Sequence, residues 1–402
     1  MMKGTVYVVH ILQTIHTYWP QVGGAQIYVH NLAKILIEKD HTVTVFTHRF
    51  PGTLKREIIE GVHVRRFDVI PWKPYGIPHH RVQPSYPLAI LRHANEFDLI
   101  NFQMQFVWTT DSALPFKKLK LIQKPVIFSP IGFSHLHKTG WWVNRLYYKF
   151  WIPLMLKAAD TVVAWTKYEQ ITILKLYDIE KEKVPHIPPG IDFGRYEQLP
   201  SPEIFKNRFD INSENMVLFV GNFFGNKAPD YLIKAIPSVL SENPDTSFVF
   251  IGWEGKKGYM KLCRDLAKKL QVNEQIIFTG PISFTERDLI LSGYGGANVL
   301  AMPSRWENFG LVLLEALACE TPFVGAYTGG TFELEQKKCG FGYKFSDITA
   351  LSEKLNRLLS DKKLAKKMGK HGRNVVRTEY DIKTVAERTE ALYNQLFSEY
   401  YR

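Results

Sequence analysis

The sequence predicts an α/β protein made of two Rossmann-like domains, and three observations support this fold class. Its 402 residues are enough for two domains of ordinary size. Short apolar runs alternate along the chain with stretches of helical periodicity, the pattern of parallel β-α-β units. A composition of 45% hydrophobic and 22% charged residues is that of a globular protein with a sizeable core.

The elements of the first domain follow in order. The chain opens with a strand, a glycine-containing loop, a helix and a second strand, at Thr5–Leu12, Gln13–Gly24, Ala25–Lys39 and Thr42–Thr47. The dinucleotide fingerprint G-x-G-x-x-G is absent. The pair Gly23-Gly24 either lets the backbone approach a phosphate or only makes the turn. Four further strands are predicted at Val62–Phe67, Phe97–Phe102, Val126–Ser129 and Thr161–Trp165.

A linker and a second α/β unit come next. Regular secondary structure is interrupted at the segment Pro188-Pro189-Gly190-Ile191-Asp192, because proline and glycine favour turns. We therefore place the linker between Gly190 and Pro202. Helical stretches then separate strands predicted at Met216–Gly221, Ser247–Gly252, Gln275–Thr279 and Asn298–Met302. A last helix is predicted at Ile382–Tyr401.

Several candidate functional residues lie in the stretch from Pro303 to Gly330. Leu311–Ala318 is apolar all round except for Glu315, which predicts a buried helix. Asn308-Phe309-Gly310 falls near its start, where unpaired backbone N–H groups favour a phosphate. Glu307 precedes this anion site and Glu315 lies roughly 8–12 Å further along the helix axis.

This spacing fits a ligand with hydroxyl groups at both ends and phosphates between them. A nucleotide sugar is such a molecule, and its hydroxyls would satisfy a carboxylate that is costly to bury alone. The alternative is that Glu315 pairs with a core Arg or Lys while Glu307 is solvated.

The motif P-S-x-x-E-x-F-G-L-V-L-L-E-A resembles the E-x7-E signature of GT-B glycosyltransferases, in the retaining group called glycosyltransferase family 4. A second segment, V-G-N-F-F-G-N-K from Val220 to Lys227, is similar to the family pattern of a glycine, an arginine and a lysine that face the donor diphosphate. Lys227 matches the lysine. Asn222 stands where the arginine is usual, and asparagine supplies no charge.

The resemblance implies two facing Rossmann-like domains (GT-B) with an interdomain cleft. It implies an acceptor-binding domain at residues 1–194 plus 381–402 and a nucleotide-sugar-binding domain at 195–380. The catalytic candidates are Glu307, Lys227 and His135. The donor-binding candidates are Gly23, Gly24, Asn222, Gly280, Pro281, Ile282, Arg305, Asn308, Phe309, Gly310, Leu311 and Glu315.

The implied reaction is metal-independent hexosyl transfer with retention, from a UDP- or GDP-sugar to a glycan or lipid-linked glycan. The nucleotide sugar is then a substrate, and we expect no cofactor. The sequence shows no Asp-x-Asp motif placed to hold a metal, and the pair His135 and His137 has no further ligand at a metal-type spacing.

Position 131 departs from the family pattern. The family commonly has a histidine directly before the glycine that ends a strand, and here Ile131 precedes Gly132. His135, a few residues later, either reaches the sugar or the acceptor or is a structural histidine.

Charge is distributed unevenly between the two halves. Residues 1–195 hold 24 Lys and Arg against 14 Asp and Glu, whereas residues 196–402 hold 27 against 25. A basic first domain would attract an anionic membrane surface or an acidic glycan. Basic and aromatic residues mix at 111–123 and 141–151; these either meet a membrane interface or pack helices onto the sheet. No recognisable nucleic-acid module is present, so we expect no nucleic-acid partner.

The sequence also indicates the cellular compartment of the protein. No apolar run approaches the ~20 residues that cross a bilayer, and the amino-terminal stretch is predicted to be a strand rather than a signal peptide. Three cysteines (Cys263, Cys319, Cys339) form no disulfide framework. We therefore expect a cytoplasmic protein, with peripheral binding to the inner face of the membrane as an additional hypothesis.

Three other functions remain open. The first is another enzyme on this scaffold, such as a nucleotide-sugar epimerase or a phosphorylase. The second is a non-catalytic sugar-nucleotide-binding or partner protein, which Asn222 and Ile131 favour. A nicotinamide-dependent oxidoreductase is the third, and the missing glycine fingerprint argues against it.

Overall fold

The chain folds into two compact units. The first comprises the residues up to Gly190 together with those from Ile382 onward, and the second runs from Ile191 to Asp381. The computed structural model describes residues 7–21, 23–70, 81–132, 145–283 and 285–401. The first boundary comes after residue 190 rather than 194, because Ile191 already belongs to the second unit: its N–H donates to the carbonyl of Tyr380 at 2.9 Å.

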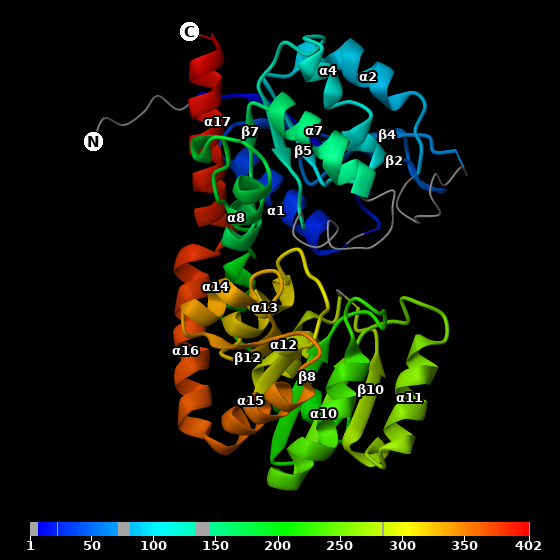
Figure 1. Ribbon diagram of the computed structural model, residues 1–402, viewed down its shortest axis with the longest axis vertical. Coiled ribbons are helices and arrows are strands. Elements are labelled where there is room, and N and C mark those ends of the chain that lie inside the picture. The colour runs from blue at the N-terminus through cyan, green and yellow to red at the C-terminus, as the bar shows by residue number, and fades with distance from the viewer. Residues whose placement is uncertain (1–6, 22, 71–80, 133–144, 284, 402) are drawn as a thin grey trace. The chain divides into compact units, whose positions relative to one another are not determined.

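The first unit contains a seven-stranded sheet in the order β3-β4-β2-β1-β5-β6-β7. Strands β2, β4, β5 and β7 of this sheet are labelled in Figure 1. All neighbours are parallel except β3, which is antiparallel to β4. The sequence did not predict β3, and only the start of the predicted strand Thr161–Trp165 pairs in the sheet. The strands are β1 His10–Thr14, β2 Thr42–His48, β3 Arg56–Ile59, β4 Val62–Phe67, β5 Leu99–Gln103, β6 Val126–Ser129 and β7 Thr161–Val162.

Helices cover both faces of this sheet. They are α1 Gly24–Glu38, α2 Tyr86–His93, α3 Trp108–Asp111, α4 Pro115–Lys118, α7 Ile152–Ala158, α8 Lys167–Leu176 and α17 Ile382–Tyr401, with a π-helical segment at Tyr147–Trp151. The last helix belongs to the first unit, as the family resemblance implied, and it packs against α1. Its buried Tyr393 hydroxyl accepts hydrogen bonds from the side-chain amides of Gln13 (3.0 Å) and Asn101 (3.1 Å). These bonds tie the carboxyl-terminal helix to strands β1 and β5.

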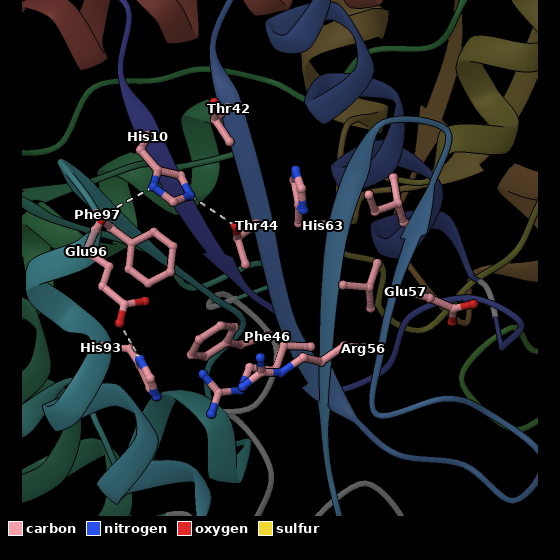
Figure 2. A pocket seen from close by; sticks show the side chains of 13 residues that line it. His10, Thr42, Thr44, Phe46, Arg56, Glu57, His63, His93, Glu96 and Phe97 are labelled. Atoms are coloured by element: carbon pink, nitrogen blue, oxygen red, sulfur yellow. Dashed lines mark hydrogen bonds and ion pairs between the residues drawn. The ribbon is translucent and has the colours of Figure 1, made fainter.

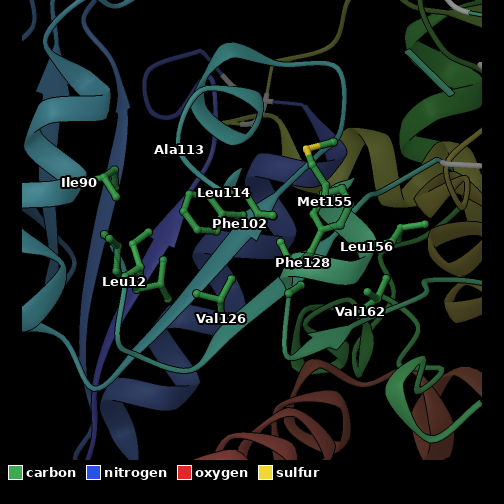
Figure 3. Packing of buried hydrophobic residues seen from close by; sticks show 14 of the residues in the cluster. Leu12, Ile90, Phe102, Ala113, Leu114, Val126, Phe128, Met155, Leu156 and Val162 are labelled. Carbon is green, nitrogen blue, oxygen red and sulfur yellow. The ribbon is translucent and has the colours of Figure 1, made fainter. Parts of the chain in front are cut away.

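One face of the first sheet is only partly covered. Near the amino ends of β1 and β2 it carries a cavity lined by both polar and apolar side chains (Figure 2). Over the rest of the face, side chains from α2 and α7 pack on strand residues, with Leu12, Phe102 and Phe128 at the centre (Figure 3). Both phenylalanines are fully buried, and each contributes about 2–3 kcal/mol through its removal from water.

The second unit contains a six-stranded parallel sheet in the order β10-β9-β8-β11-β12-β13. Its strands are β8 Asn215–Val220, β9 Thr246–Ile251, β10 Ile276–Gly280, β11 Val299–Met302, β12 Phe323–Ala326 and β13 Gly340–Tyr343. The helices are α9 Glu203–Arg208, α10 Pro229–Glu242, α11 Tyr259–Lys269, α12 Arg287–Gly296, α13 Leu311–Ala318, α14 Thr331–Gln336, α15 Ile348–Ser360 and α16 Lys362–Glu379. The prediction of two Rossmann-like α/β domains is therefore confirmed. None of the described helices is long and apolar enough to cross a membrane.

Replacing Gly369 by alanine is expected to destabilise the second unit. Alanine normally stabilises a helix interior by about 1 kcal/mol relative to glycine. At Gly369, however, a Cβ atom would lie 1.7 Å from the carbonyl oxygen of Glu320, so α16 would have to move away from the end of α13. Because such overpacking costs about 3 kcal/mol, we expect the midpoint of thermal unfolding to fall by several degrees.

Gly295→Ala is the matched control, since a Cβ atom at this helical glycine of α12 meets nothing within 4 Å. Its melting temperature should stay unchanged or rise slightly. Equal melting temperatures for the two variants would contradict the close contact between α16 and the end of α13.

Candidate active site

The loop between β11 and α13 presents a buried carboxylate. Glu307 is 8% exposed. Its Oε1 accepts from the Lys227 ammonium at 2.5 Å and from the Ser304 hydroxyl at 2.8 Å. Its backbone N–H donates to Thr328 Oγ1 at 2.7 Å. The alternative of a solvated Glu307 is therefore wrong: the side chain is enclosed and neutralised by a cation.

Lys227 reaches Glu307 from a different loop. It lies between β8 and α10, 80 positions earlier in the chain. In the sheet, β8 and β11 are neighbours, and the strand order runs outward from them in opposite directions. In open parallel sheets ligands bind at this switch point, beyond the carboxyl ends of the strands. The Lys227–Glu307 ion pair joins the two loops at that point.

Helix α13 begins beside this ion pair. Gly310 precedes its first residue with φ +88°, a left-handed conformation that favours glycine, and no side chain caps the helix. A Cβ atom at Gly310 would also lie 2.8 Å from the sulfur of Met302. The amide of Leu313 already donates to the carbonyl of Gly310 at 2.9 Å. Within the described residues the amides of Leu311 and Val312 have no such partner, so they can meet an anion, as at other uncapped helix starts.

Phe309 and Asn308 have different environments at this helix start. Phe309 is 1% exposed, and its ring lies 5.7 Å from that of Tyr380. Its carbonyl accepts from the N–H of Gly330 at 2.7 Å. Asn308 is exposed. Packing of the Phe309 ring thus fixes the loop that carries Glu307.

Glu315 lies further along α13 and is half-buried. Desolvation raises the pKa of this carboxyl group, while a hydrogen bond from Tyr294 and the charges of Arg195 and Lys227 act in the opposite direction. The Tyr294 hydroxyl donates to Oε2 at 2.6 Å. Within the described residues the other oxygen, Oε1, has no hydrogen-bond partner. The alternative, an ion pair between Glu315 and a core Arg or Lys, is therefore wrong. A tyrosine hydroxyl bonds one carboxylate oxygen, and the other oxygen is available to a ligand hydroxyl.

The remaining donor candidates of the second unit also lie beyond carboxyl ends of strands. Asn222 follows β8 and is half-buried. Gly280 ends β10 with φ +74°, and its carbonyl accepts from Gly252 at 3.1 Å. Pro281 is exposed and Ile282 half-buried.

Arg305 is exposed beside the loop that carries Lys227. Its guanidinium lies 5.3 Å from the ring centre of Phe345 and 5.9 Å from that of Trp306. Its backbone N–H donates to the carbonyl of Asn226 at 2.7 Å. This bond holds the loops after β8 and β11 together, next to Lys227.

The first-unit candidates are only partly described. Gly23 and Gly24 are exposed at the start of α1, which again has no side-chain cap. His135 and His137 lie outside the described residues. Ile131 and Gly132 end the β6 segment in left-handed conformations, with φ values of +47° and +91°.

Two family models together match most of the chain. Residues 22–195 match the model described as Glycosyltransferase Family 4, and residues 201–375 match Glycosyl transferases group 1. Sucrose-phosphate synthase from Thermosynechococcus elongatus superposes with a TM-score of 0.78 at 21% identity, covering 97% of this chain and 99% of that one. The chain is a glycosyltransferase of the GT-B fold.

Relatives of this glycosyltransferase carry different names. A D-inositol 3-phosphate glycosyltransferase from Kineococcus radiotolerans is 33% identical over 44% of the chain and 41% of its own length. A GDP-mannose-dependent mannosyltransferase from Mycolicibacterium smegmatis is 24% identical over 90% of the chain and 93% of its own length. Spore coat protein SA from Bacillus subtilis is 25% identical over 93% and 95%. HepE from Anabaena, solved with UDP and glucose, superposes with a TM-score of 0.76 at 20% identity, covering 96% of this chain and 100% of that one.

Glu169 is a buried carboxylate of the glycosyltransferase's first unit that was not predicted from the sequence. Glu169 accepts from the backbone N–H groups of Gly132 (3.1 Å) and Trp165 (2.7 Å), so it holds the turn after β6. A signal was present: Thr166 and Glu169 have the spacing of a capping box, and Thr166 Oγ1 accepts from the N–H of Glu169 at 2.9 Å. Glu169 therefore positions the backbone at Gly132.

A half-buried carboxylate, Asp111, should make stability depend on pH. The Tyr147 hydroxyl donates to Asp111 at 2.7 Å, but desolvation outweighs this bond and raises the pKa of Asp111 to about 8. The folded state thus holds a proton that the unfolded state releases near pH 4, so stability falls as pH rises between these values. From about pH 6 to pH 8 the loss should be roughly 2 kcal/mol.

Asp111→Asn should remove this slope, because the amide cannot ionise. Asp178→Asn, at an exposed position of the same unit, should keep it. Urea unfolding followed across this pH range tests the expectation. Parallel pH profiles for the wild type and Asp111→Asn would contradict it.

Proposed function

We propose that this glycosyltransferase moves a sugar, with retention of configuration, from a nucleoside diphosphate sugar to an acceptor hydroxyl on a glycan or lipid-linked glycan. The observation that carries the proposal is the Lys227–Glu307 ion pair beside the uncapped start of α13. Cation and helix amides offer a place for a diphosphate, and the carboxylate offers an acceptor for the hydroxyls of the attached sugar.

Lys227 can serve both groups at once in this proposal. An ammonium has three N–H donors, and among the described residues only Glu307 uses one. Two donors are left for phosphate oxygens. Together with the amides of Phe309, Gly310 and Leu311, they would stabilise the negative charge that develops on the departing diphosphate.

The other proposed contacts to the donor are assigned from where each residue lies relative to the carboxyl ends of the strands. Glu315 Oε1 would accept from the ribose hydroxyls, and the backbone at Gly280, Pro281 and Ile282 would meet the base. Asn222 would donate one hydrogen bond to the diphosphate without adding charge. Arg305 could supply the missing cation if its guanidinium leaves the Phe345 ring.

The bond changes balance without a protein nucleophile. The anomeric carbon–oxygen bond to the diphosphate breaks, and its electron pair stays on the phosphate oxygen. The acceptor oxygen bonds to the same face of the carbon, and its proton passes to a diphosphate oxygen. Neither a metal nor a cofactor takes part in this proposal. In the first unit, Gly23, Gly24 and His135 are proposed to contact the donor diphosphate, the sugar or the acceptor, on the family resemblance alone.

A donor screen followed by product analysis tests the proposed function. Thermal shifts with UDP, GDP and ADP and their sugars identify the donor, and NMR of the product's anomeric proton reports the configuration. An inverted product would exclude the retaining mechanism. A sugar interconverted without any acceptor would favour an epimerase.

A second candidate function is a non-catalytic sugar-nucleotide-binding or partner protein. The loss of a cation at Asn222 favours it, because the diphosphate is then less well neutralised. Tight donor binding with neither transfer nor slow hydrolysis of the donor would support this candidate.

Peripheral binding of the first unit to an anionic membrane is proposed from its charge. One of its lysines is already engaged: the Lys117 ammonium lies 2.9 Å from Asp160 and 2.9 Å from the hydroxyl of Tyr400. Exposed Leu119, Leu121, Phe150 and Trp151 supply apolar surface. Sedimentation with phosphatidylglycerol vesicles tests this proposal.

A further inference from the structure

A cavity of about 560 Å³ lies on the partly covered face of the first sheet. This volume is within the usual range for small-molecule sites. Side chains of alternate strand residues line it, and the end of α2 and the turn that follows form one wall (Figure 2). His10 and Thr42 begin β1 and β2, and Phe97 lies just before β5. The cavity is therefore at the amino ends of these parallel strands, away from the carboxyl ends that lead to Gly23 and Gly132.

Two arginines face each other in this cavity. Arg56 of β3 and Arg65 of β4 are directly opposite in the antiparallel register, and both line the cavity. Like charges at directly opposite positions destabilise a strand pair. Burial lowers the pKa of Arg65, and the charge of Arg56 lowers it further. Within the described residues neither arginine forms an ion pair with a carboxylate. The charge of Glu96, which lines the cavity and pairs with His93, and the rings of Phe46 and Phe67, each 5.4 Å from the Arg65 guanidinium, offset the repulsion only in part.

Nearby carboxylates are already engaged elsewhere. Glu57 pairs with the buried Arg66, and Asp68 pairs with Arg49 and Lys55. A smaller cavity of about 260 Å³ shares Arg56 and Arg65 with the first and adds Lys55, Arg66 and Arg92. The local excess of cations thus extends over two adjoining cavities.

The rest of the lining suits a compact polar molecule. The His10 Nδ1 lies 2.9 Å from the carbonyl of Glu96, and since a carbonyl only accepts, Nδ1 carries a proton. In the neutral ring, Nε2 then accepts from the Thr44 hydroxyl at 3.1 Å. Phe46 and Phe97 are buried in the floor, while Thr42 and His63 are exposed at the rim. Apolar ring surface and hydroxyl or imidazole groups lie on the same side of the sheet.

We propose that this cavity binds a phosphate monoester on a small polar body, with the phosphate between Arg56 and Arg65. A phosphate oxygen can bridge two guanidinium groups by charge-assisted hydrogen bonds, which turns their repulsion into a preorganised anion site. The polar body would contact Thr42 and His63. This site is separate from the proposed donor contacts and does not rest on the proposed function.

Calorimetry on the full chain tests the proposal, with glucose 6-phosphate as the probe and glucose as the uncharged control. We expect saturable binding of the phosphate ester alone, weakened by salt. The double variant Arg56→Gln/Arg65→Gln should bind about tenfold more weakly or worse, because two hydrogen bonds to a charged group are lost. Lys175→Gln/Lys181→Gln, which removes two exposed charges of the same unit, should bind within about twofold of the wild type.

The melting temperature of a single variant and the binding of lipid vesicles test the proposal independently. Arg56→Gln alone, at an exposed edge-strand position, should raise the melting temperature of the ligand-free protein slightly because one of two opposed charges is gone. Vesicles of phosphatidylcholine with and without phosphatidic acid distinguish a lipid phosphate from a soluble one; vesicle binding that requires both arginines also supports the site. Binding of neither probe, or equal binding by the arginine double variant and the wild type, would overturn it.

Discussion

Replacing Lys227 by alanine is expected to lower the kcat/KM of glycosyl transfer by about 10²- to 10³-fold, the usual effect of removing one group that stabilises charge in a transition state. The variant loses the cation proposed to face the departing diphosphate. It also removes the counter-charge of the Glu307 carboxylate, which is 8% exposed and keeps its hydrogen bond from the Ser304 hydroxyl. Because the ion pair is partly buried, we expect a stability loss of about 1–3 kcal/mol as well.

Lys234→Ala is the matched control. Lys234 belongs to the same unit and pairs with Asp230 at 2.8 Å, one helical turn away on α10. Losing this pair should cost about 0.5 kcal/mol and leave transfer unchanged. Initial-rate assays with the identified donor decide the matter, and wild-type rates for Lys227→Ala would remove the lysine from the proposed site.

Replacing Glu307 by glutamine is expected to separate binding from turnover. Glutamine keeps the shape of the side chain and an oxygen that accepts from Lys227 and Ser304, so the melting temperature should change little. The negative charge is gone, however, and with it the proposed interaction with the transferring sugar. We expect kcat to fall by about 10²-fold or more. Lys227 would then face the diphosphate without a competing carboxylate, so affinity for the nucleoside diphosphate should stay equal or increase.

Glu242→Gln, at an exposed position at the end of α10, controls for the general loss of a negative charge. It should match the wild type in rate and affinity. Steady-state kinetics combined with nucleotide titration measures both quantities. If Glu307→Gln lowered nucleotide affinity and left kcat intact, the carboxylate would act in binding rather than in transfer.

Some elements of this glycosyltransferase were predictable because their signal is local. Strands β4 and β6 and helix α13 have the predicted bounds. Strand β6 is a continuous apolar run, β4 begins with alternating apolar and polar residues, and Gly310 marks the helix start. Strand β3 was missed because Arg56 and Glu57 open it, and β13 because two of its four residues are glycine. These two segments are strands because they pair with β4 and β12, and not because their residues favour the extended conformation.

The sequence by itself determined the two α/β domains, the helix that begins after Gly310, and which residues flank that helix start. Only the tertiary structure decided what those residues touch. It paired Glu307 with Lys227 across 80 positions, gave Glu315 a tyrosine instead of a cation, and set Arg56 opposite Arg65. The physical reason is range: periodicity and glycine placement act over a few residues, whereas charge pairing depends on which strands become neighbours in the sheet.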